Sequence, residues 1–254
     1  MSTITLNDGS RVPWLAFGTG TALYGKDASD FVKTAIDNGI THLDGAQMYN
    51  NEETLGAGIK ASGKPRSELY ITTKLKGLEP GQTATEALQV SLRKLNLDYV
   101  DLFLIHSPSP ANKEGKLKAL WEEMEEIHSK GLAKSIGVSN FRVEDLNVIL
   151  DGAKVIPAVN QVKFSCRHST FRSNSARSSY ILTFGKLLSQ STNSAKSAEL
   201  SSLRMVVRLR LYGRLGDPLM PFSQPFVKGS KKLAANLSLA GRCWVNGSYK
   251  REPS

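Results

Sequence analysis

The chain has 254 residues, of which 40% are hydrophobic and 22% charged. This balance excludes a chain that is disordered as a whole and a membrane protein, and it allows one domain with a full core. Residues 1–5 hold no basic region followed by an apolar stretch, so we expect no signal peptide and a cytoplasmic protein. The two cysteines, Cys166 and Cys243, make neither a disulfide framework nor a metal-ligand spacing, so no metal is expected.

The net charge of +10 is confined to the last third of the sequence. Residues 1–164 carry 18 Lys and Arg against 20 Asp and Glu, whereas residues 165–254 carry 15 against 3. Serine also rises, with 17 in the last 90 residues against 11 in the first 164. We therefore predict two segments, which are a domain over residues 1–164 and a basic, serine-rich, poorly ordered segment over residues 165–254.

The first segment alternates between strand and helix patterns. Residues 3–17 favour a hairpin, because apolar stretches flank the turn residues Asn7-Asp8-Gly9-Ser10. Apolar side chains at helical spacing then predict helices over residues 30–38, 51–61, 83–95, 117–128 and 143–150. Short apolar or β-branched stretches predict strands over residues 40–43, 69–73, 99–105, 133–138 and 155–162.

This alternation predicts βαβ units around a parallel sheet that is covered on both faces. The glycine-rich Gly18-Thr19-Gly20-Thr21 lacks the third glycine of a Rossmann fingerprint, so six such units favour a (β/α)₈ TIM barrel. A complete barrel needs about 250 residues. Only the N-terminal hairpin and the first six βα units are recognisable, and we therefore predict an incomplete barrel.

Polar side chains close five successive predicted strands. They are Asp44, with Tyr49 in the loop after it, Lys74, His106, Ser139-Asn140 and Asn160-Gln161. Each taken alone has an ordinary structural explanation, such as a helix cap, a solvated charge or a packed ring. In a (β/α)₈ barrel the C-terminal strand ends share one mouth, where active sites lie. Together, these residues indicate a proton-transfer site.

The sequence around these residues resembles the aldo-keto reductase family. Residues 43–52 (LDGAQMYNNE) are similar to the family motif D-x-A-x-x-Y-x-N-E. The motifs of its third to sixth strands are matched by residues 71–74 (ITTK), 101–106 (DLFLIH), 134–141 (KSIGVSNF) and 157–162 (PAVNQV). The resemblance covers roughly residues 3–164, with five motifs in the family's order and spacing.

The resemblance implies NADPH-dependent reduction of an aldehyde or ketone. The catalytic set that it implies is Asp44, Tyr49, Lys74 and His106. Tyr49 would donate a proton to the carbonyl oxygen, and the Lys74 ammonium would favour the phenolate that remains. Asp44 would keep Lys74 charged and aimed, and His106 would orient the substrate carbonyl.

The resemblance also implies a binding site for the nicotinamide cofactor. Ser139, Asn140 and Gln161 would hold the nicotinamide carboxamide. Further candidate contacts to the cofactor are Asp44 and the four residues Gly18, Thr19, Gly20 and Thr21. A small-molecule carbonyl substrate, no metal, no membrane partner and a monomeric chain complete these expectations.

After Phe164 the family's sequence stops, and its last two βα units are not recognisable. An altered reading frame is one explanation. When permitted codons are written for residues 239–253 and read from the third base of each codon, one choice encodes a stretch similar to the family's seventh helix. The alternative is a catalytically inactive barrel or partner subunit whose basic tail binds nucleic acid, although a solvated segment is the simpler expectation. A barrel without its last strands leaves open edges, so we predict weak activity and poor solubility.

Overall fold

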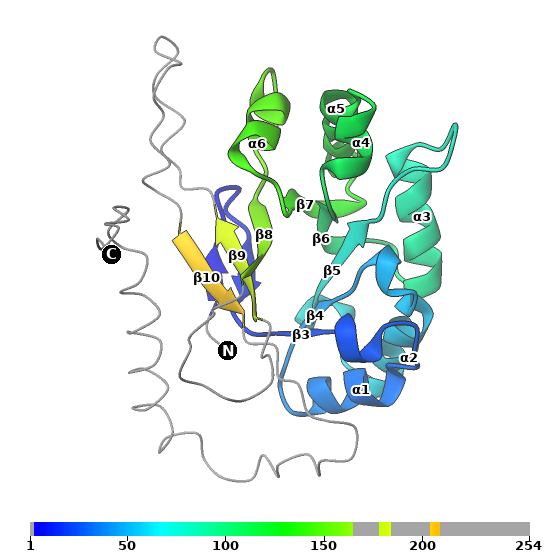
Figure 1. Ribbon diagram of the computed structural model, residues 1–254. Helices are drawn as coiled ribbons and strands as arrows, with labels where there is room; N and C mark the ends of the chain where they lie inside the picture. Colours follow the sequence, from blue (N-terminus) through cyan, green and yellow to red (C-terminus); the bar gives the residue numbers. More distant parts are fainter. Residues whose placement is uncertain (1–2, 165–177, 184–203, 209–254) are drawn as a thin grey trace, which may run out of the picture. The chain divides into compact units, whose positions relative to one another are not determined.

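The computed structural model describes residues 3–164, 178–183 and 204–208 (Figure 1). Contacts divide the chain into two units, Met1–Tyr212 and Gly213–Ser254, and all the described residues belong to the first. Within these ranges, no helix is both long and apolar enough to cross a membrane.

The described chain opens with a hairpin and continues as alternating strands and helices. The hairpin pairs β1 (Thr3–Thr5) with β2 (Arg11–Pro13). The later strands are β3 (Ala16–Gly18), β4 (His42–Asp44), β5 (Tyr70–Leu75), β6 (Val100–Ile105), β7 (Ala133–Ser139) and β8 (Val159–Phe164). The helices are α1 (Ser29–Asp37), α2 (Glu52–Ser62), α3 (Ala84–Leu95), α4 (Ser109–Lys113), α5 (Leu117–Ser129) and α6 (Val143–Leu150). Short 3₁₀ helices are η1 (Thr21–Leu23), η2 (Gln47–Tyr49) and η3 (Arg66–Glu68).

Strands β3 to β8 form a parallel sheet in sequence order. The sheet curls, and the helices that connect its strands lie along its outer face (Figure 1). No pairing joins the two ends of the sheet among the residues that the structure describes. The fold is therefore an incomplete (β/α)₈ barrel, as the sequence predicts.

The far end of the sheet differs from the sequence-based expectation. Strand β9 (Ser178–Thr183) pairs antiparallel with β8 along its whole length, and β10 (Arg204–Arg208) pairs antiparallel with β9. The edge of β8, which we expected to be open, is therefore covered by a strand from the basic segment. The remainder of that segment, including residues 239–253, lies outside the described residues.

Two strand boundaries also differ from the prediction. The sixth strand starts at Val159 and not at residue 155, because Pro157 has no N–H to donate to a sheet ladder. The apolar run of residues 12–17 is divided between hairpin strand β2 and the first barrel strand, β3. In addition, the short helix α4 was not predicted.

Helix α3 shows how the sequence fixes the ends of these elements. Thr83 accepts the backbone N–H of Glu86, and the Glu86 carboxylate accepts the backbone N–H of Thr83, which completes a capping box. The helix ends at Asn96, whose φ of 54° is a left-handed conformation that asparagine tolerates. Its buried stripe includes Leu88, Leu92 and Leu95.

The core lies on both sides of the sheet because successive side chains of a strand point to opposite faces. Outward residues such as Ile71 and Phe103 pack in one buried cluster with the helices. Inward residues Leu102 and Leu104 cluster with Leu6 and Val12 of the N-terminal hairpin region. Full burial of one such side chain stabilises the fold by about 1.5–3 kcal/mol. The hairpin therefore fills the interior of the sheet at one end and leaves the C-terminal strand ends for other residues.

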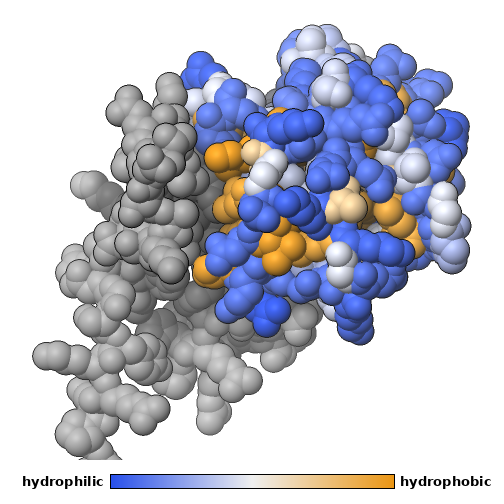
Figure 2. All heavy atoms as spheres, turned by 90° about the horizontal axis from the view of Figure 1, so that it is seen from above, coloured by the Kyte–Doolittle hydropathy of each residue, from blue (hydrophilic) through white to orange (hydrophobic). Residues whose placement is uncertain are grey.

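One face of the described part is mainly polar. Figure 2 shows this face as largely hydrophilic, with apolar side chains in separate patches among the hydrophilic ones. Large apolar side chains with substantial exposure include Tyr24, Met48 and Val143. Tyr24 and Met48 lie in or next to the 3₁₀ helices that come after β3 and β4.

Candidate active site

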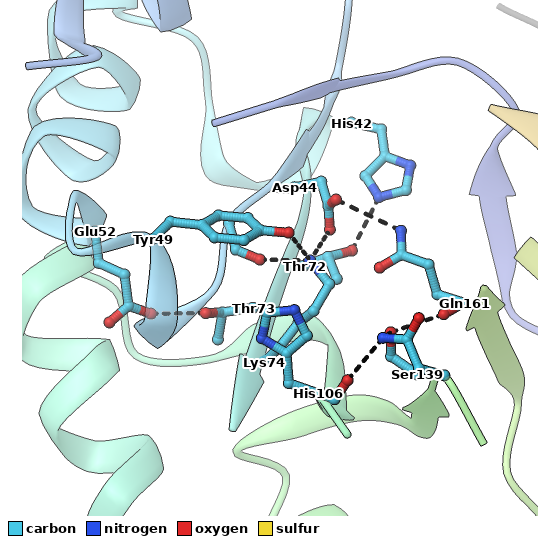
Figure 3. A network of polar contacts seen from close by, with 12 residues as sticks. His42, Asp44, Tyr49, Glu52, Thr72, Thr73, Lys74, His106, Ser139 and Gln161 are labelled. Carbon is cyan, nitrogen blue, oxygen red and sulfur yellow. Dashed lines mark hydrogen bonds and ion pairs between the residues drawn. The ribbon is translucent and has the colours of Figure 1, made fainter. Parts of the chain in front are cut away.

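Lys74 is the centre of a buried polar cluster at the C-terminal end of β5 (Figure 3). Its Nζ donates to Asp44 Oδ1 at 2.7 Å, to the Gly45 carbonyl at 2.8 Å and to the Tyr49 hydroxyl at 3.4 Å. These bonds use the three N–H donors of an ammonium group. The side chain is only 1% exposed, so the carboxylate and the two oxygen acceptors together replace its hydration.

Tyr49 reaches this cluster from the 3₁₀ helix η2, which comes after β4. The residue after it, Asn50, has a left-handed φ of 52° and turns the chain into α2. The Tyr49 carbonyl accepts the N–H of Gly25, which ties η2 to the loop after β3. The phenol ring is buried, with Lys74 Nζ 5.0 Å from its centroid. The hydroxyl of Tyr49 is thereby directed at the ammonium group (Figure 3).

His106 lies immediately after β6 and completes the set of four predicted catalytic residues. Its backbone N–H donates to the Leu75 carbonyl at 3.1 Å, which holds it beside the end of β5. Its ring packs edge-on against Tyr49, with the ring centroids 5.6 Å apart and an interplanar angle of 84°. The structure therefore brings the four predicted residues together, from three neighbouring strand ends and one loop.

The predicted carboxamide-binding residues belong to the neighbouring strands β7 and β8. Ser139 ends β7 and Asn140 follows it, whereas Gln161 is the third residue of β8, which runs on to Phe164 and so does not end at Gln161 as the sequence predicts. The Ser139 hydroxyl donates to the Gln161 carbonyl at 2.7 Å, and the Gln161 amide donates to Asp44 Oδ2 at 3.5 Å. The Asn140 amide donates to the His106 carbonyl and to Ser139 Oγ, each at 3.0 Å. Asn140 has a φ of 61°. These contacts join Ser139, Asn140 and Gln161 to the cluster around Lys74.

The loop from Gly18 to Thr21 lies beside Asp44. Gly18 ends β3, and the N–H of Thr19 donates to the Asp44 carbonyl at 3.1 Å. Gly20 caps η1, and Thr21, its first residue, has a φ of 62°. Such a conformation is strained for a β-branched residue.

Two polar residues have structural roles that the sequence analysis did not assign. The Asn51 amide donates to the carbonyls of Thr19 and Leu23, at 2.9 and 2.6 Å, and so holds the loop after β3. The Asn160 amide donates to the Phe141 carbonyl at 2.9 Å and so supports the turn that holds Asn140. Asn51 belongs to the motif in residues 43–52 that resembles the family, so this motif was the sequence signal that could have pointed to Asn51.

A further buried carboxylate, that of Glu52, lies next to this cluster. It accepts hydrogen bonds from Thr73 and Ser91. Burial raises the pKa of Glu52 above its ordinary value, while the hydrogen bonds from Thr73 and Ser91 and the charges of Lys94 and Lys74 oppose the rise. Among the described residues, no group of three or more His, Cys, Asp or Glu side chains is arranged to hold a metal ion.

The relatives found by comparison with known proteins include three that are named as reductases. Glyoxal reductase of Bacillus subtilis is 42% identical over 166 residues, which is 65% of this chain and 59% of that protein. The NAD/NADP-dependent indole-3-acetaldehyde reductase of Schizosaccharomyces pombe is 40% identical over 164 residues, 61% of this chain and 57% of that protein. An aldo-keto reductase of Mycobacterium leprae is 37% identical over 227 residues, 85% of this chain and 79% of that protein.

Solved structures and a family model agree with these relatives. The crystal structure of an aldo/keto reductase from Brucella melitensis superposes with a TM-score of 0.57 at 37% identity, covering 64% of this chain and 63% of that one. The model of the aldo/keto reductase family matches residues 14–179. The described fold is thus the incomplete (β/α)₈ barrel of a protein of this class. The chain belongs to the aldo/keto reductase family.

The extent of these matches bears on the predicted segments. The chain spans 59% and 57% of the length of the first two relatives. The family match runs to residue 179, and the Mycobacterium leprae alignment covers 85% of the chain, so both continue past residue 164. The division of the chain at residue 164 and the poor order of residues 165–254 stay predictions.

Proposed function

We propose that this chain reduces an aldehyde or ketone to an alcohol with NADPH as the reductant. The observation that carries the proposal is the contact of Tyr49 and Lys74 at the barrel mouth. The Tyr49 hydroxyl lies 3.4 Å from Lys74 Nζ, which in turn lies 2.7 Å from Asp44. An acid next to a buried, paired cation is suited to giving up a proton.

In the proposed reaction, Tyr49 is the general acid. Its hydroxyl proton passes to the carbonyl oxygen as negative charge develops there, and the phenolate that remains faces the Lys74 ammonium. Asp44 is the counter-ion of Lys74 within a buried pair and holds its ammonium in place. His106, packed edge-on against Tyr49, orients the substrate carbonyl toward the hydroxyl.

The residues around the cluster fit a nicotinamide ring. A carboxamide offers one acceptor and two donors, and the hydroxyl and amide side chains of Ser139, Asn140 and Gln161 offer matching groups on β7, on the turn after it and on the neighbouring strand β8. The loop Gly18–Thr21 borders the same mouth through the contact of Thr19 with Asp44. When bound, the nicotinamide supplies the hydride, and the protein supplies position and electrostatics.

The choice of NADPH and of substrate class rests on family likeness. The Bacillus subtilis relative is named for glyoxal, and the Schizosaccharomyces pombe relative for indole-3-acetaldehyde and for either cofactor. We accordingly propose a small carbonyl compound as the substrate. Turnover is expected to be low, because β3 and β10 are not paired with each other in the described part of the chain and the sheet stays open.

Substitution of Tyr49 by Phe tests the proposal. The variant keeps the ring that packs on His106 and removes the hydroxyl, which is both the proton donor and an acceptor for Lys74, so reduction of glyoxal or indole-3-acetaldehyde should be lost. Binding of NADPH, monitored by its fluorescence, should remain. Undiminished turnover in Tyr49→Phe would refute the role of Tyr49, and a parent chain that neither binds nor oxidises NADPH would refute the proposed activity.

A further inference from the structure

Behind the candidate site, the side chains of Gln47, Glu52, Thr73 and Ser91 form a hydrogen-bonded group that we call the polar ring. Thr73 Oγ1 donates to Glu52 Oε1 at 2.6 Å, and Ser91 Oγ donates to Glu52 Oε2 at 3.2 Å. Gln47 Nε2 donates to Ser91 Oγ at 3.0 Å, while Gln47 Oε1 accepts the Lys76 N–H at 2.9 Å. The ring closes through the backbone that runs from Thr73 to Lys76.

The polar ring joins the two elements that carry Tyr49 and Lys74. Gln47 is the first residue of η2, and Tyr49 is its last. Thr73 precedes Lys74 in β5, so their side chains point to opposite faces of the strand. Figure 3 shows the bond between Glu52 and Thr73 on the side of β5 away from the Lys74 ammonium. The contacts of Lys74 fix the site from inside the barrel, and the ring links the same elements from outside.

The hydrogen bonds of the ring are directional and leave Glu52 as a pure acceptor. Each hydroxyl donates its single proton to the carboxylate, and the Gln47 amide uses its second proton on the Ala87 carbonyl at 3.1 Å. Glu52 is 5% exposed, and Thr73 and Ser91 are fully buried. An ionised Glu52 therefore holds three elements, α2, α3 and β5, in one arrangement.

Stability alone does not account for such a ring. Buried charged networks are often matched or exceeded in stability by well-packed apolar side chains of similar volume. The ring instead helps to fix the position of Tyr49 relative to Lys74. This position matters because the bond from Lys74 Nζ to Tyr49 OH, at 3.4 Å, is the longest of the three that Lys74 makes. A small displacement of η2 would break it, since hydrogen bonds weaken quickly beyond this length.

We propose that Glu52 is a positioning residue, which through the polar ring holds η2 against β5 and thereby keeps the Tyr49 hydroxyl on the Lys74 ammonium. Its effect on catalysis rests on the proposed function. A misplacement of about 1 Å can cost about 100-fold in rate. Loss of a ring bond should therefore lower kcat and leave the binding of NADPH unchanged, because the hydrogen bonds that define the ring go to none of the proposed cofactor-binding residues.

Thr73→Val tests the ring by removing one hydroxyl with little change of shape, and Thr73→Ser restores that hydroxyl. The matched control is Ser135→Ala, since Ser135 Oγ donates to Asp8 Oδ2 at the same 2.6 Å, near the hairpin. The first measurement is amide hydrogen exchange of the full chain. Thr73→Val should accelerate exchange at Lys76 and in η2, and the other two variants should leave exchange there at the parent rate. Unchanged exchange at these amides in Thr73→Val, or a uniform increase over the whole fold, would overturn the proposal.

The second measurement is steady-state reduction of glyoxal. Thr73→Val should lower kcat by about tenfold or more, with an unchanged KM for NADPH, and Thr73→Ser should recover most of the loss. A rise in the KM for NADPH at constant kcat would contradict a positioning role. If the parent chain does not oxidise NADPH, the proposed function fails, and the exchange measurement still decides whether the ring positions η2.

Discussion

The ammonium of Lys74 and the carboxylate of Asp44 form a buried ion pair, with Nζ and Oδ1 2.7 Å apart and the side chains 1% and 4% exposed. The two residues come from the neighbouring strands β4 and β5 and face the same side of the sheet. The pair is the geometric basis of the proposed reaction, because it keeps a positive charge next to the Tyr49 hydroxyl in a place that water hardly reaches.

Asp44→Asn should destabilise the fold as well as impair reduction. The variant keeps the shape of the side chain but leaves a buried ammonium without its counter-ion, which costs about 3–5 kcal/mol. Urea unfolding of the parent and the variant measures this difference. Asp37→Asn is the control, because the Lys33–Asp37 pair has the same type of contact at 2.6 Å with side chains 44% and 47% exposed. Such a surface pair contributes at most about 1 kcal/mol, so equal losses in the two variants would contradict the account.

The raised pKa of Glu52 predicts a pH dependence of stability that Glu52→Gln removes. At a pH between the ordinary pKa of 4.5 and the raised pKa, Glu52 is protonated in the folded chain and ionised in the unfolded chain. The free energy of unfolding of the parent, relative to Glu52→Gln, should therefore fall as the pH rises through this window and be constant above it. Unfolding curves from about pH 4 to pH 8 test the sign. A relative stability that increases with pH would show that the pKa is lowered.

Gly58→Ala should destabilise the packing of α2 on α1. A Cβ at Gly58 would lie 2.5 Å from the Ser29 carbonyl oxygen and 2.7 Å from Val32 Cβ, so one helix must move. We expect a net loss of about 1–3 kcal/mol from overpacking, although alanine is the better helix former by about 1 kcal/mol. Ala57→Gly, on the exposed side of the same helix, measures that propensity separately. A Gly58→Ala chain more stable than the parent would exclude the close contact.

The sequence predicts most of the barrel and the strand ends at which the residues of the candidate site meet. Asp44, Lys74 and His106 were recognisable because parallel strands bring their C-terminal ends to one edge, whatever the connecting helices contain. The order of strands derives from the alternation of strand and helix patterns, since each βαβ unit places its strand next to the preceding one. These features depend on local sequence, and the structure confirms the incomplete barrel.

Other features depend on contacts between distant residues and had no local signal. Residues 178–183 form a strand that pairs antiparallel with β8, and the composition of this strand does not specify that direction. Asn160 and Gln161 are neighbours in β8, so their side chains point to opposite faces of the sheet. Gln161 therefore contacts Asp44, whereas Asn160 supports the backbone of Phe141. The polar ring likewise exists only because α2, α3 and β5 pack together.

Transfer of deuterium from NADPH deuterated at the hydride position to glyoxal measures the proposed reaction most directly. Mass spectrometry of the alcohol product should find one deuterium on the carbinol carbon with the parent chain and with Ser135→Ala, even at low turnover. With Tyr49→Phe, no labelled product should form above the level without protein. Equal amounts of labelled product from the parent and Tyr49→Phe, or none from the parent, would contradict the assignment of Tyr49, Lys74 and Asp44 as a carbonyl-reducing site.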